Sequence, residues 1–429
     1  MRLTVRTAFK CFGGICTAAL LSATASAVTL PRYNADPGQV TVSGVSSGGA
    51  MAVQAHVAYS GTFRGAAVFA GVAYYCAQGS TALAIGRCQE PVTSAEIPVA
   101  ELVATTRDWA SRGYVDDTAN LASSKVYMFS GTLDQTVRQP SMDALRDYYL
   151  NFMAPANLVY NNQTAAGHSW VSPLGKVLCA AQQSPFINDC FIDPEKTFLS
   201  LFYGALQPRQ SGALSGIFIP VDQGEFLDDR NPNLHGLDNN AFLYVPASCG
   251  RGETCKVHVA FHGCSMSYAK IGDQFIRTAG INEWADTNRM LVLYPQVLAS
   301  TTPLNGLGCW DWFGYDNADY AKKNGPQLLM TKRMVDRITS AFAPVAAPAN
   351  LAVTKLTPWA VSLAWSGVQG ATSYRLYRNG TPLTASGALG TDYTDNSVAR
   401  STSYSYTVRA VASNGNEGPA STPLMAMSR

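Results

Sequence analysis

The stretch VTVSGVSSGGAMAVQAHVAYSG, residues 40–61, indicates the fold of the larger part of this chain. It begins with the alternation of a short strand, turns on a Gly-x-Ser-x-Gly sequence at residues 44–48 and continues as an apolar helical run. That context is typical of a nucleophile elbow, where glycines let strand and helix approach while the serine hydroxyl stays exposed. Chance can also produce the motif in a chain with 36 glycines, but the context favours function. We therefore predict that Ser46 is a nucleophile.

The composition is that of an ordinary globular protein, with 429 residues, 47% hydrophobic and 14% charged, and a net charge of +2. Nothing in this balance indicates a nucleic-acid partner. Residues 1–27 combine a basic start, an apolar middle and a small-residue site at 25–27, which is typical of a secretory signal peptide. Removal of its three basic residues takes the net charge from +2 to −1, and a near-neutral surface suits an uncharged substrate. We predict an extracellular protein, with the periplasm as the alternative, and no membrane anchor.

Cysteines support the prediction of export. Two of the ten leave with the signal peptide, and the remaining eight form an even set, which indicates disulfides in an exported chain. Eight cysteines allow 105 connectivities. Sequential neighbours close short loops, which leaves a fourth pair by default: Cys76 with Cys88, Cys179 with Cys190, Cys249 with Cys255, and Cys264 with Cys309. A zinc site is disfavoured because the chain has no C-x-x-C pair.

An Ala/Pro-rich segment, AFAPVAAPANLAVTKL at residues 341–356, separates two regions of different character. We predict a catalytic domain over 28–341, a linker over 342–349 and an all-β domain over 350–429. The last region has short alternating runs divided by turns at Asn379-Gly380 and Asn414-Gly415. It resembles a fibronectin type III sandwich, with Trp365 in its second run and Tyr404 as the tyrosine corner.

The first region mixes helical stretches with apolar runs that read as strands. Several of these runs are apolar throughout, which indicates a parallel sheet covered by helices on both faces and hence an α/β architecture. The candidate strands lie at residues 40–44, 65–71, 125–131, 241–245, 256–263 and 290–295.

A serine nucleophile needs a histidine base and a carboxylate that orients it. The chain has five histidines, and His168 lies in the polar loop NNQTAAGHSW, the kind of segment that often carries a catalytic base. His56 and His258 fall within a predicted helix and a predicted strand, so we expect them at packed or surface positions. Asp134 follows the strand KVYMFSG and therefore lies beyond the carboxyl ends of the strands, where active sites of α/β sheets form. An ordinary loop histidine and a turn-forming aspartate are the alternatives. The order Ser46, Asp134, His168 is that of the α/β-hydrolase fold.

The attack of the serine creates a tetrahedral intermediate with a negatively charged oxygen, which two backbone N–H groups must stabilise. One N–H belongs to Ser47, and the other comes from a loop that normally precedes the nucleophile in the chain. Nothing before residue 40 supplies that loop. The run KVHVAFHGCSMSY at 256–268 does, because it leads a strand into His262-Gly263-Cys264. Read from about 240 to 340 and then from 36 to 180, the chain gives a conventional hydrolase order, so the sequence is predicted to be circularly permuted.

Together, GVSSG, GTLDQTV, GHSW, FHGC and CWDWF resemble extracellular poly(3-hydroxybutyrate) depolymerases of the permuted type, over nearly all of residues 36–320. The resemblance implies a secreted serine esterase without metal or cofactor, acting on a polyhydroxyalkanoate granule or oligomers, and we expect a monomer. It implies a triad of Ser46, Asp134 and His168, with His262 shaping its loop without titrating. The implied oxyanion donors are the N–H groups of Ser47 and Cys264. Trp310 and Trp312 fit either an apolar subsite or the core.

Such depolymerases usually end in a further substrate-binding domain, and this sequence ends at Arg429, directly after the fibronectin-like module. We therefore expect activity on amorphous polymer or soluble oligomers, with exposed apolar residues of the catalytic domain contacting a granule. A feruloyl or acetyl xylan esterase is the alternative enzyme, because fold and triad are shared by many acyl transfers. A secreted scaffold with an inactive hydrolase fold is the third hypothesis, which the completeness of the motif set disfavours.

Overall fold

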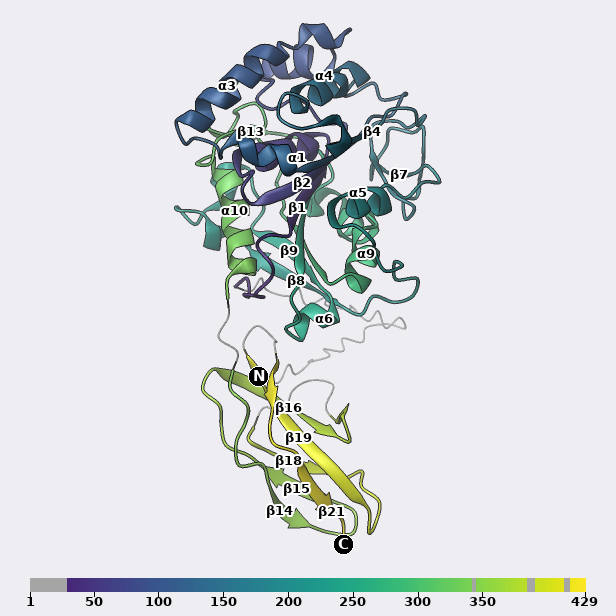
Figure 1. Cartoon of the computed structure of the whole chain (residues 1–429), viewed down its shortest axis with the longest axis vertical. Helices are drawn as coiled ribbons and strands as arrows, with labels where there is room; N and C mark the ends of the chain where they lie inside the picture. The colour runs from purple at the N-terminus through teal and green to yellow at the C-terminus, as the bar shows by residue number, and fades with distance from the viewer. Residues whose placement is uncertain (1–28, 342–344, 384–389, 413–416) are drawn as a thin grey trace, which may run out of the picture.

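The computed structural model describes residues 29–341, 345–383, 390–412 and 417–429 (Figure 1). The predicted signal peptide and the Asn414-Gly415 turn lie outside these residues. An α/β unit is followed along the chain by a unit built from strands alone. No helix in the described ranges is long and apolar enough to span a bilayer.

An eight-stranded sheet forms the centre of the α/β unit, in the order β4-β3-β2-β1-β10-β11-β9-β8. Its strands are β1 (Val40–Val45), β2 (Phe63–Phe69), β3 (Lys125–Phe129), β4 (Leu158–Asn161), β8 (Ile217–Asp222), β9 (Asn240–Val245), β10 (Lys256–Phe261) and β11 (Met290–Tyr294). The six strands from β4 to β11 pair in parallel. The predicted parallel sheet is confirmed for these six strands, whereas at one edge β9, one of the predicted strands, pairs antiparallel with both β11 and β8. An apolar run indicates burial on both faces but carries no information about strand direction.

The position of β1 explains the permuted sequence order. β1 pairs with β2, its neighbour along the chain, and also with β10, which follows it by about 200 residues. Followed from β8 to β11 and then from β1 to β4, the chain crosses the sheet from one edge to the other. This is a circularly permuted α/β-hydrolase sheet, with the strand that carries the elbow in its middle.

Alternate residues of the central strands face two separate cores. In β2, Ala66 and Val68 belong to one hydrophobic cluster, and Ala67 and Phe69 belong to the other. The first cluster is covered by α1 (Ser47–Ala58), α3 (Val99–Ser111), α4 (Gln139–Tyr149) and α10 (Pro326–Thr339). The second is covered by α5 (Pro194–Tyr203), α8 (Gln274–Thr278) and α9 (Ile281–Thr287).

Short elements and disulfides complete this unit. The short helices and turns are α2 (Thr81–Leu83), η1 (Ala84–Gln89), η2 (Ser94–Glu96), η3 (Thr118–Ser123), η4 (Pro155–Asn157), η5 (Gln223–Phe226), η6 (Pro232–His235), α6 (Ala247–Gly250) and α7 (Tyr268–Ile271). The short strands are β5 (Trp170–Val171), β6 (Val177–Leu178), β7 (Ile187–Asp189), β12 (Ser300–Thr301) and β13 (Leu304–Asn305). The disulfides join the three pairs that loop length suggested and the fourth pair that remained: Cys76–Cys88, Cys179–Cys190, Cys249–Cys255 and Cys264–Cys309.

The C-terminal unit is a fibronectin type III-like sandwich of two antiparallel sheets. One contains β14 (Ala352–Leu356), β15 (Val361–Ala364) and β18 (Asp392–Asp395); the other contains β16 (Ala371–Arg378), β17 (Thr381–Pro382), β19 (Ser403–Ala412), β20 (Glu417–Ala420) and β21 (Leu424–Met427). Trp365 lies in its core, and the Tyr404 hydroxyl accepts a 2.9 Å hydrogen bond from the N–H of Ala399, as a tyrosine corner does. Val345, inside the predicted linker, also packs in this core.

Candidate active site

The elbow is held in a strained conformation that only its neighbours' small size permits. Ser46, at the start of α1, has φ 59° and ψ −125°, and its N–H donates to the Phe69 carbonyl at 2.9 Å. A Cβ on Gly44 would lie 2.0 Å from the carbonyl oxygen of Gly48, and one on Gly48 would lie 2.3 Å from that of His262. Both positions therefore require glycine, and the turn presents Ser46 above the carboxyl ends of the strands.

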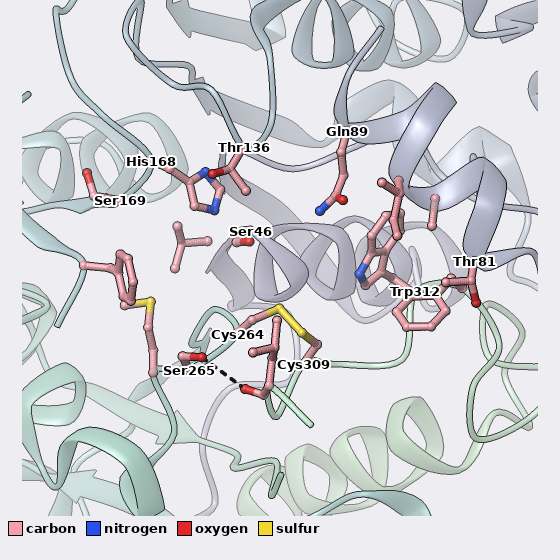
Figure 2. A pocket seen from close by; sticks show the side chains of 17 residues that line it. Ser46, Thr81, Gln89, Thr136, His168, Ser169, Cys264, Ser265, Cys309 and Trp312 are labelled. Atoms are coloured by element: carbon pink, nitrogen blue, oxygen red, sulfur yellow. Dashed lines mark hydrogen bonds between the residues drawn. A yellow bond between two sulfur atoms is a disulfide. The ribbon is translucent and has the colours of Figure 1, made fainter. Parts of the chain in front are cut away.

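Asp134 and His168 lie in the loops after β3 and β4, and the fold brings them together. Nδ1 of His168 is 2.8 Å from Oδ2 of Asp134. The other carboxylate oxygen accepts the backbone N–H groups of Thr136 and Val137, at 2.8 and 2.9 Å, so the aspartate is fixed from both sides. Both side chains are buried, and Figure 2 shows the His168 ring directed toward the side of the pocket where Ser46 lies.

Sequence reasoning missed Gln182, which links the loops of these two residues. Its side-chain oxygen accepts the backbone N–H of His168 at 3.1 Å and that of Gln135 at 3.2 Å. Gln182 lies within the loop closed by Cys179–Cys190, and the carbonyl of Cys179 accepts the N–H of Gly167 at 2.8 Å. The flanking cysteine pair was the only sequence signal that this loop has a fixed shape.

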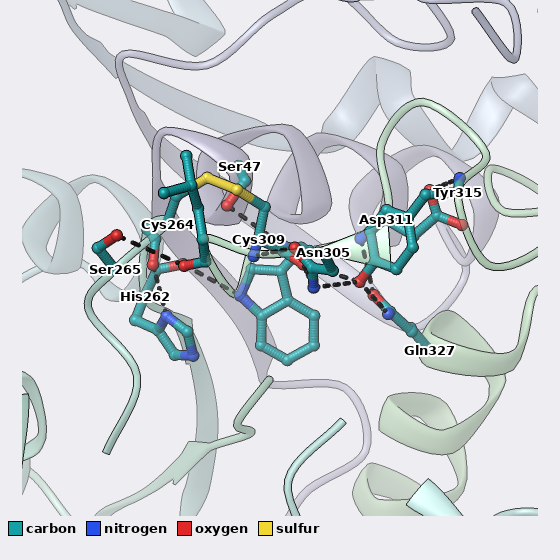
Figure 3. Close-up of a disulfide and its surroundings, with 12 residues drawn as sticks. Ser47, His262, Cys264, Ser265, Asn305, Cys309, Asp311, Tyr315 and Gln327 are labelled. Carbon is teal, nitrogen blue, oxygen red and sulfur yellow. Dashed lines mark hydrogen bonds between the residues drawn. A yellow bond between two sulfur atoms is a disulfide. The ribbon is translucent and has the colours of Figure 1, made fainter. Parts of the chain in front are cut away.

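The loop after β10 lies against the elbow. A Cβ on Gly263 would lie 3.3 Å from Cβ of Ser46, so this glycine allows the close approach. Figure 3 shows the Cys264–Cys309 disulfide beside Ser47, which joins the loop to the segment that begins at residue 309. Within the described ranges, neither the N–H of Ser47 nor that of Cys264 has a hydrogen-bond acceptor. Two unpaired N–H donors therefore flank the serine.

His262 fixes the shape of this loop from a buried position. Its Nδ1 lies 2.7 Å from the carbonyl oxygen of Gly263, and its Nε2 accepts the N–H of Val297 at 3.3 Å. Burial lowers the pKa of His262 to about 4, so the ring is neutral at physiological pH. The hydrogen bonds specify the tautomer with the proton on Nδ1.

Ser46 and His168 open into one pocket of about 410 Å³. Its walls are mainly apolar, and of the described residues that line it only His168 is ionisable. The walls include Ala84, Ile85, Phe186, Met266, Leu307, Trp312 and Phe313. Such a site suits an uncharged, partly apolar ligand, because it offers no fixed charge to pair with one.

The chain is 45% identical over 408 residues to the poly(3-hydroxybutyrate) depolymerase of Delftia acidovorans, a match that covers 92% of this chain and 80% of that relative. The chain belongs to the poly(3-hydroxybutyrate) depolymerase family. It is also 37% identical over 338 residues to the polyhydroxybutyrate depolymerase of Talaromyces funiculosus, which covers 76% of this chain and 96% of the fungal protein. No family model matches the chain.

Among solved structures, a PHB depolymerase with one serine replaced by alanine, in complex with an R3HB trimer, matches with a TM-score of 0.67 and 35% identity. The match covers 74% of this chain and all of that one. A crystal structure of the PHB depolymerase from Penicillium funiculosum matches equally well. The depolymerase fold therefore accounts for most of this chain.

From the sequence, Trp310 and Trp312 fitted either an apolar subsite or the core, and the structure gives the two residues different positions. Trp310 is fully buried and does not line the pocket, so its assignment to the subsite is wrong. Its Nε1 donates to the His262 carbonyl at 3.0 Å, and its ring packs on Phe261, which makes it a support for the loop. Trp312 does line the pocket. Between them, the Asp311 carboxylate accepts backbone N–H groups of residues 314–317 and thereby holds the segment in place.

Proposed function

We propose that this chain hydrolyses the ester bonds of poly(3-hydroxybutyrate) through an acyl-enzyme on Ser46. The observation that carries the proposal is the mainly apolar pocket into which Ser46 and His168 both open, with the 2.8 Å His168–Asp134 pair behind it. Relatives named as depolymerases of this polymer support the choice of substrate. So does the related depolymerase that was solved with an R3HB trimer.

In the first half of the reaction, Oγ of Ser46 bonds to the ester carbonyl carbon while its proton passes to Nε2 of His168. Asp134 holds the imidazole in the tautomer that leaves Nε2 free and stabilises the imidazolium that forms. The negative oxygen of the tetrahedral intermediate is received by the N–H groups of Ser47 and Cys264. His168 then gives the proton to the leaving alkoxide, and the acyl group stays on Ser46.

In the second half, water takes the place of the alcohol. His168 removes a proton from the water as it attacks the acyl carbon, the same two N–H groups receive the oxyanion, and the proton returns to Oγ of Ser46 as the acid leaves. The disulfide to Cys309 and the bonds of His262 and Trp310 keep the Cys264 donor in place during both halves. Trp312 provides a flat apolar surface for the hydroxyacid unit.

Contact with solid polymer is assigned to exposed apolar side chains of the catalytic domain, two of which line the pocket. Ile85 and Leu307 line the pocket and are more than half exposed, at 52% and 62%. Leu133 precedes Asp134 and is also exposed, and Leu178 and Phe191 flank the Cys179–Cys190 disulfide at 80% and 94% exposure. Exposed apolar groups on the catalytic unit favour adsorption to an apolar surface.

Action outside the cell is part of the proposal, because solid polymer is too large to enter one. Four disulfides in the described residues favour an oxidising compartment. The basic, apolar and small-residue pattern of residues 1–27 supports export.

The test is the loss of turbidity of an amorphous poly(3-hydroxybutyrate) suspension with the mature protein and with its Ser46→Ala variant. We expect clearing by the wild type and a loss of at least about a thousandfold in the variant, with the circular dichroism spectrum unchanged. If the wild type hydrolyses p-nitrophenyl butyrate and releases ferulate or acetate from xylan but leaves the polyester turbid, the proposed substrate is wrong. Residual clearing by the variant above a thousandth of the wild-type rate would exclude Ser46 as the nucleophile.

A further inference from the structure

One wall of the pocket is a short segment with unusual backbone geometry. Residues 84–89 form the π-helical turn η1, in which residues about five apart share a face because the hydrogen bonds run from i to i+5. Ala84, Ile85 and Gln89 consequently all reach the pocket. Turns of this kind occur frequently at functional sites.

The backbone at Gln89 is fixed by covalent and hydrogen bonds. Cys88, its neighbour, is buried and joined to Cys76. The carbonyl of Gln89 accepts the N–H of Arg138 at 2.9 Å, and the Ser141 hydroxyl donates to the Cys88 carbonyl at 2.6 Å. The segment is therefore docked on the start of α4, and the Gln89 side chain leaves from a defined point.

The amide of Gln89 points into the pocket without a protein partner. Figure 2 shows its amide end directed into the cavity, on the side where Trp312 lies. No hydrogen bond within the described part of the chain involves this amide. Two neighbouring hydroxyls are in use, because Ser169 donates to the Gly167 carbonyl and Ser265 to that of Leu307. A polar amide in an apolar pocket is stabilised when a ligand supplies the missing partner.

We propose that the Gln89 amide donates a hydrogen bond to an ester carbonyl of the bound polyester, next to the ester that is cleaved. This rests on the proposed function. An internal hydroxybutyrate unit offers only acceptors, two ester oxygens, and no donor, so a side-chain NH₂ group is the matching partner. Gln89 thereby distinguishes a chain of several ester units from a simple alkyl ester, and it is a specificity-determining residue.

The experiment compares two substrates in the full-length mature protein: the methyl ester of the (R)-3-hydroxybutyrate trimer, and p-nitrophenyl butyrate, which has no second ester. The readout is the ratio of kcat/KM on the trimer to kcat/KM on p-nitrophenyl butyrate. In Gln89→Met, which keeps the length of the side chain and removes its donors, we expect this ratio to fall about three- to tenfold, the effect of one neutral hydrogen bond. In Gln89→Glu, which keeps the shape and replaces donors by acceptors, we expect at least the same fall at pH 8.

Gln183→Met is the matched control, because the Gln183 side chain is exposed and does not line the pocket. Its ratio should equal that of the wild type. An unchanged ratio in both Gln89 variants would overturn the proposal, as would equal losses on both substrates, which would indicate a packing role for the wall. If the ratio of kcat/KM values fell in Thr136→Val but not in Gln89→Met, the hydrogen bond would belong to Thr136, which also lines the pocket, and the proposal would be overturned. A wild type that cleaves p-nitrophenyl butyrate but not the trimer would overturn the proposed function together with this inference.

Discussion

The side-chain oxygen of Gln182 accepts a hydrogen bond from the backbone N–H of His168, 3.1 Å away. The same oxygen accepts the N–H of Gln135, the residue after Asp134. One amide therefore joins the loop of the proposed base to the loop of the proposed acid. Catalysis depends on the orientation of the histidine, so this link positions the pair without touching substrate.

We expect Gln182→Ala to lower kcat about tenfold with little change in KM, because the lost contact orients His168 and binds no substrate. Gln182→Glu keeps the accepting oxygen and should restore most of the activity. Gln183→Ala is the neighbouring control. Steady-state kinetics and the pH profile of kcat/KM test this, and a rise in KM at constant kcat would contradict a positioning role.

Removal of the Cys264–Cys309 disulfide should affect both stability and rate. The bond spans 45 residues, and the chain-entropy model assigns it about 4 kcal/mol. The double variant Cys264→Ala/Cys309→Ala should lose stability of this order and about tenfold or more in kcat, because the proposed Cys264 donor is no longer tethered. Cys249→Ala/Cys255→Ala, which opens a six-residue loop outside the pocket lining, should lose about 2 kcal/mol and keep its kcat. A full kcat in the first variant would show that the tether is dispensable for the donor.

Gly48→Ala should abolish activity. The added Cβ would lie 2.3 Å from the His262 carbonyl, and backbone on both sides leaves no flexible group to move away. We expect at least about a hundredfold loss of kcat/KM and about 2 kcal/mol or more of destabilisation. Gly212→Ala, with no neighbouring atom nearer than 4.0 Å, should resemble the wild type. Near-normal activity of Gly48→Ala would mean that the elbow and the His262-Gly263-Cys264 loop are not packed as closely as described.

His56 makes the stability of the protein depend on pH. Burial lowers the pKa of His56 to about 3, whereas a histidine in the unfolded chain titrates near pH 6.5. Between these values only the unfolded state binds the proton. The contribution of His56 to the free energy of unfolding is therefore complete above about pH 7 and is lost as the pH falls, by up to about 1.4 kcal/mol per pH unit.

His56→Phe removes this proton uptake. Urea unfolding at pH 7 and pH 5 should show a loss of stability about 2 kcal/mol smaller in the variant than in the wild type. Tyr149→Phe is the matched control, because it removes the 3.0 Å hydrogen bond to Nδ1 of His56 but keeps the imidazole. If the free energy of unfolding changed with pH to the same extent in the wild type and in His56→Phe, His56 would not be the source of the pH dependence.

Features that depend only on neighbouring residues could be predicted from the sequence. The elbow at Ser46 needs only a strand, small residues and a helix in succession, and its positive φ is a local property. The six predicted strands were each recognisable from an apolar run, and three of the disulfides close loops short enough to suggest the pairing. The order of Ser46, Asp134 and the His-Gly-Cys loop also indicated the permuted order of strands, because each motif marks the end of a particular strand.

The remaining features depend on contacts between segments that are far apart in the chain, and they become visible only in the folded protein. The direction of β9 is set by its partners β8 and β11, not by its own apolar residues. Trp310 and Trp312 are two residues apart in one aromatic run, yet packing against Phe261 buries the first and leaves the second at the pocket. Gln89 and Gln182 look like any other glutamine in the sequence. The residues around each of these two amides come from loops that are far apart in the chain. Such long-range packing produces no periodic pattern in the residues next to the glutamine, so the sequence does not reveal it.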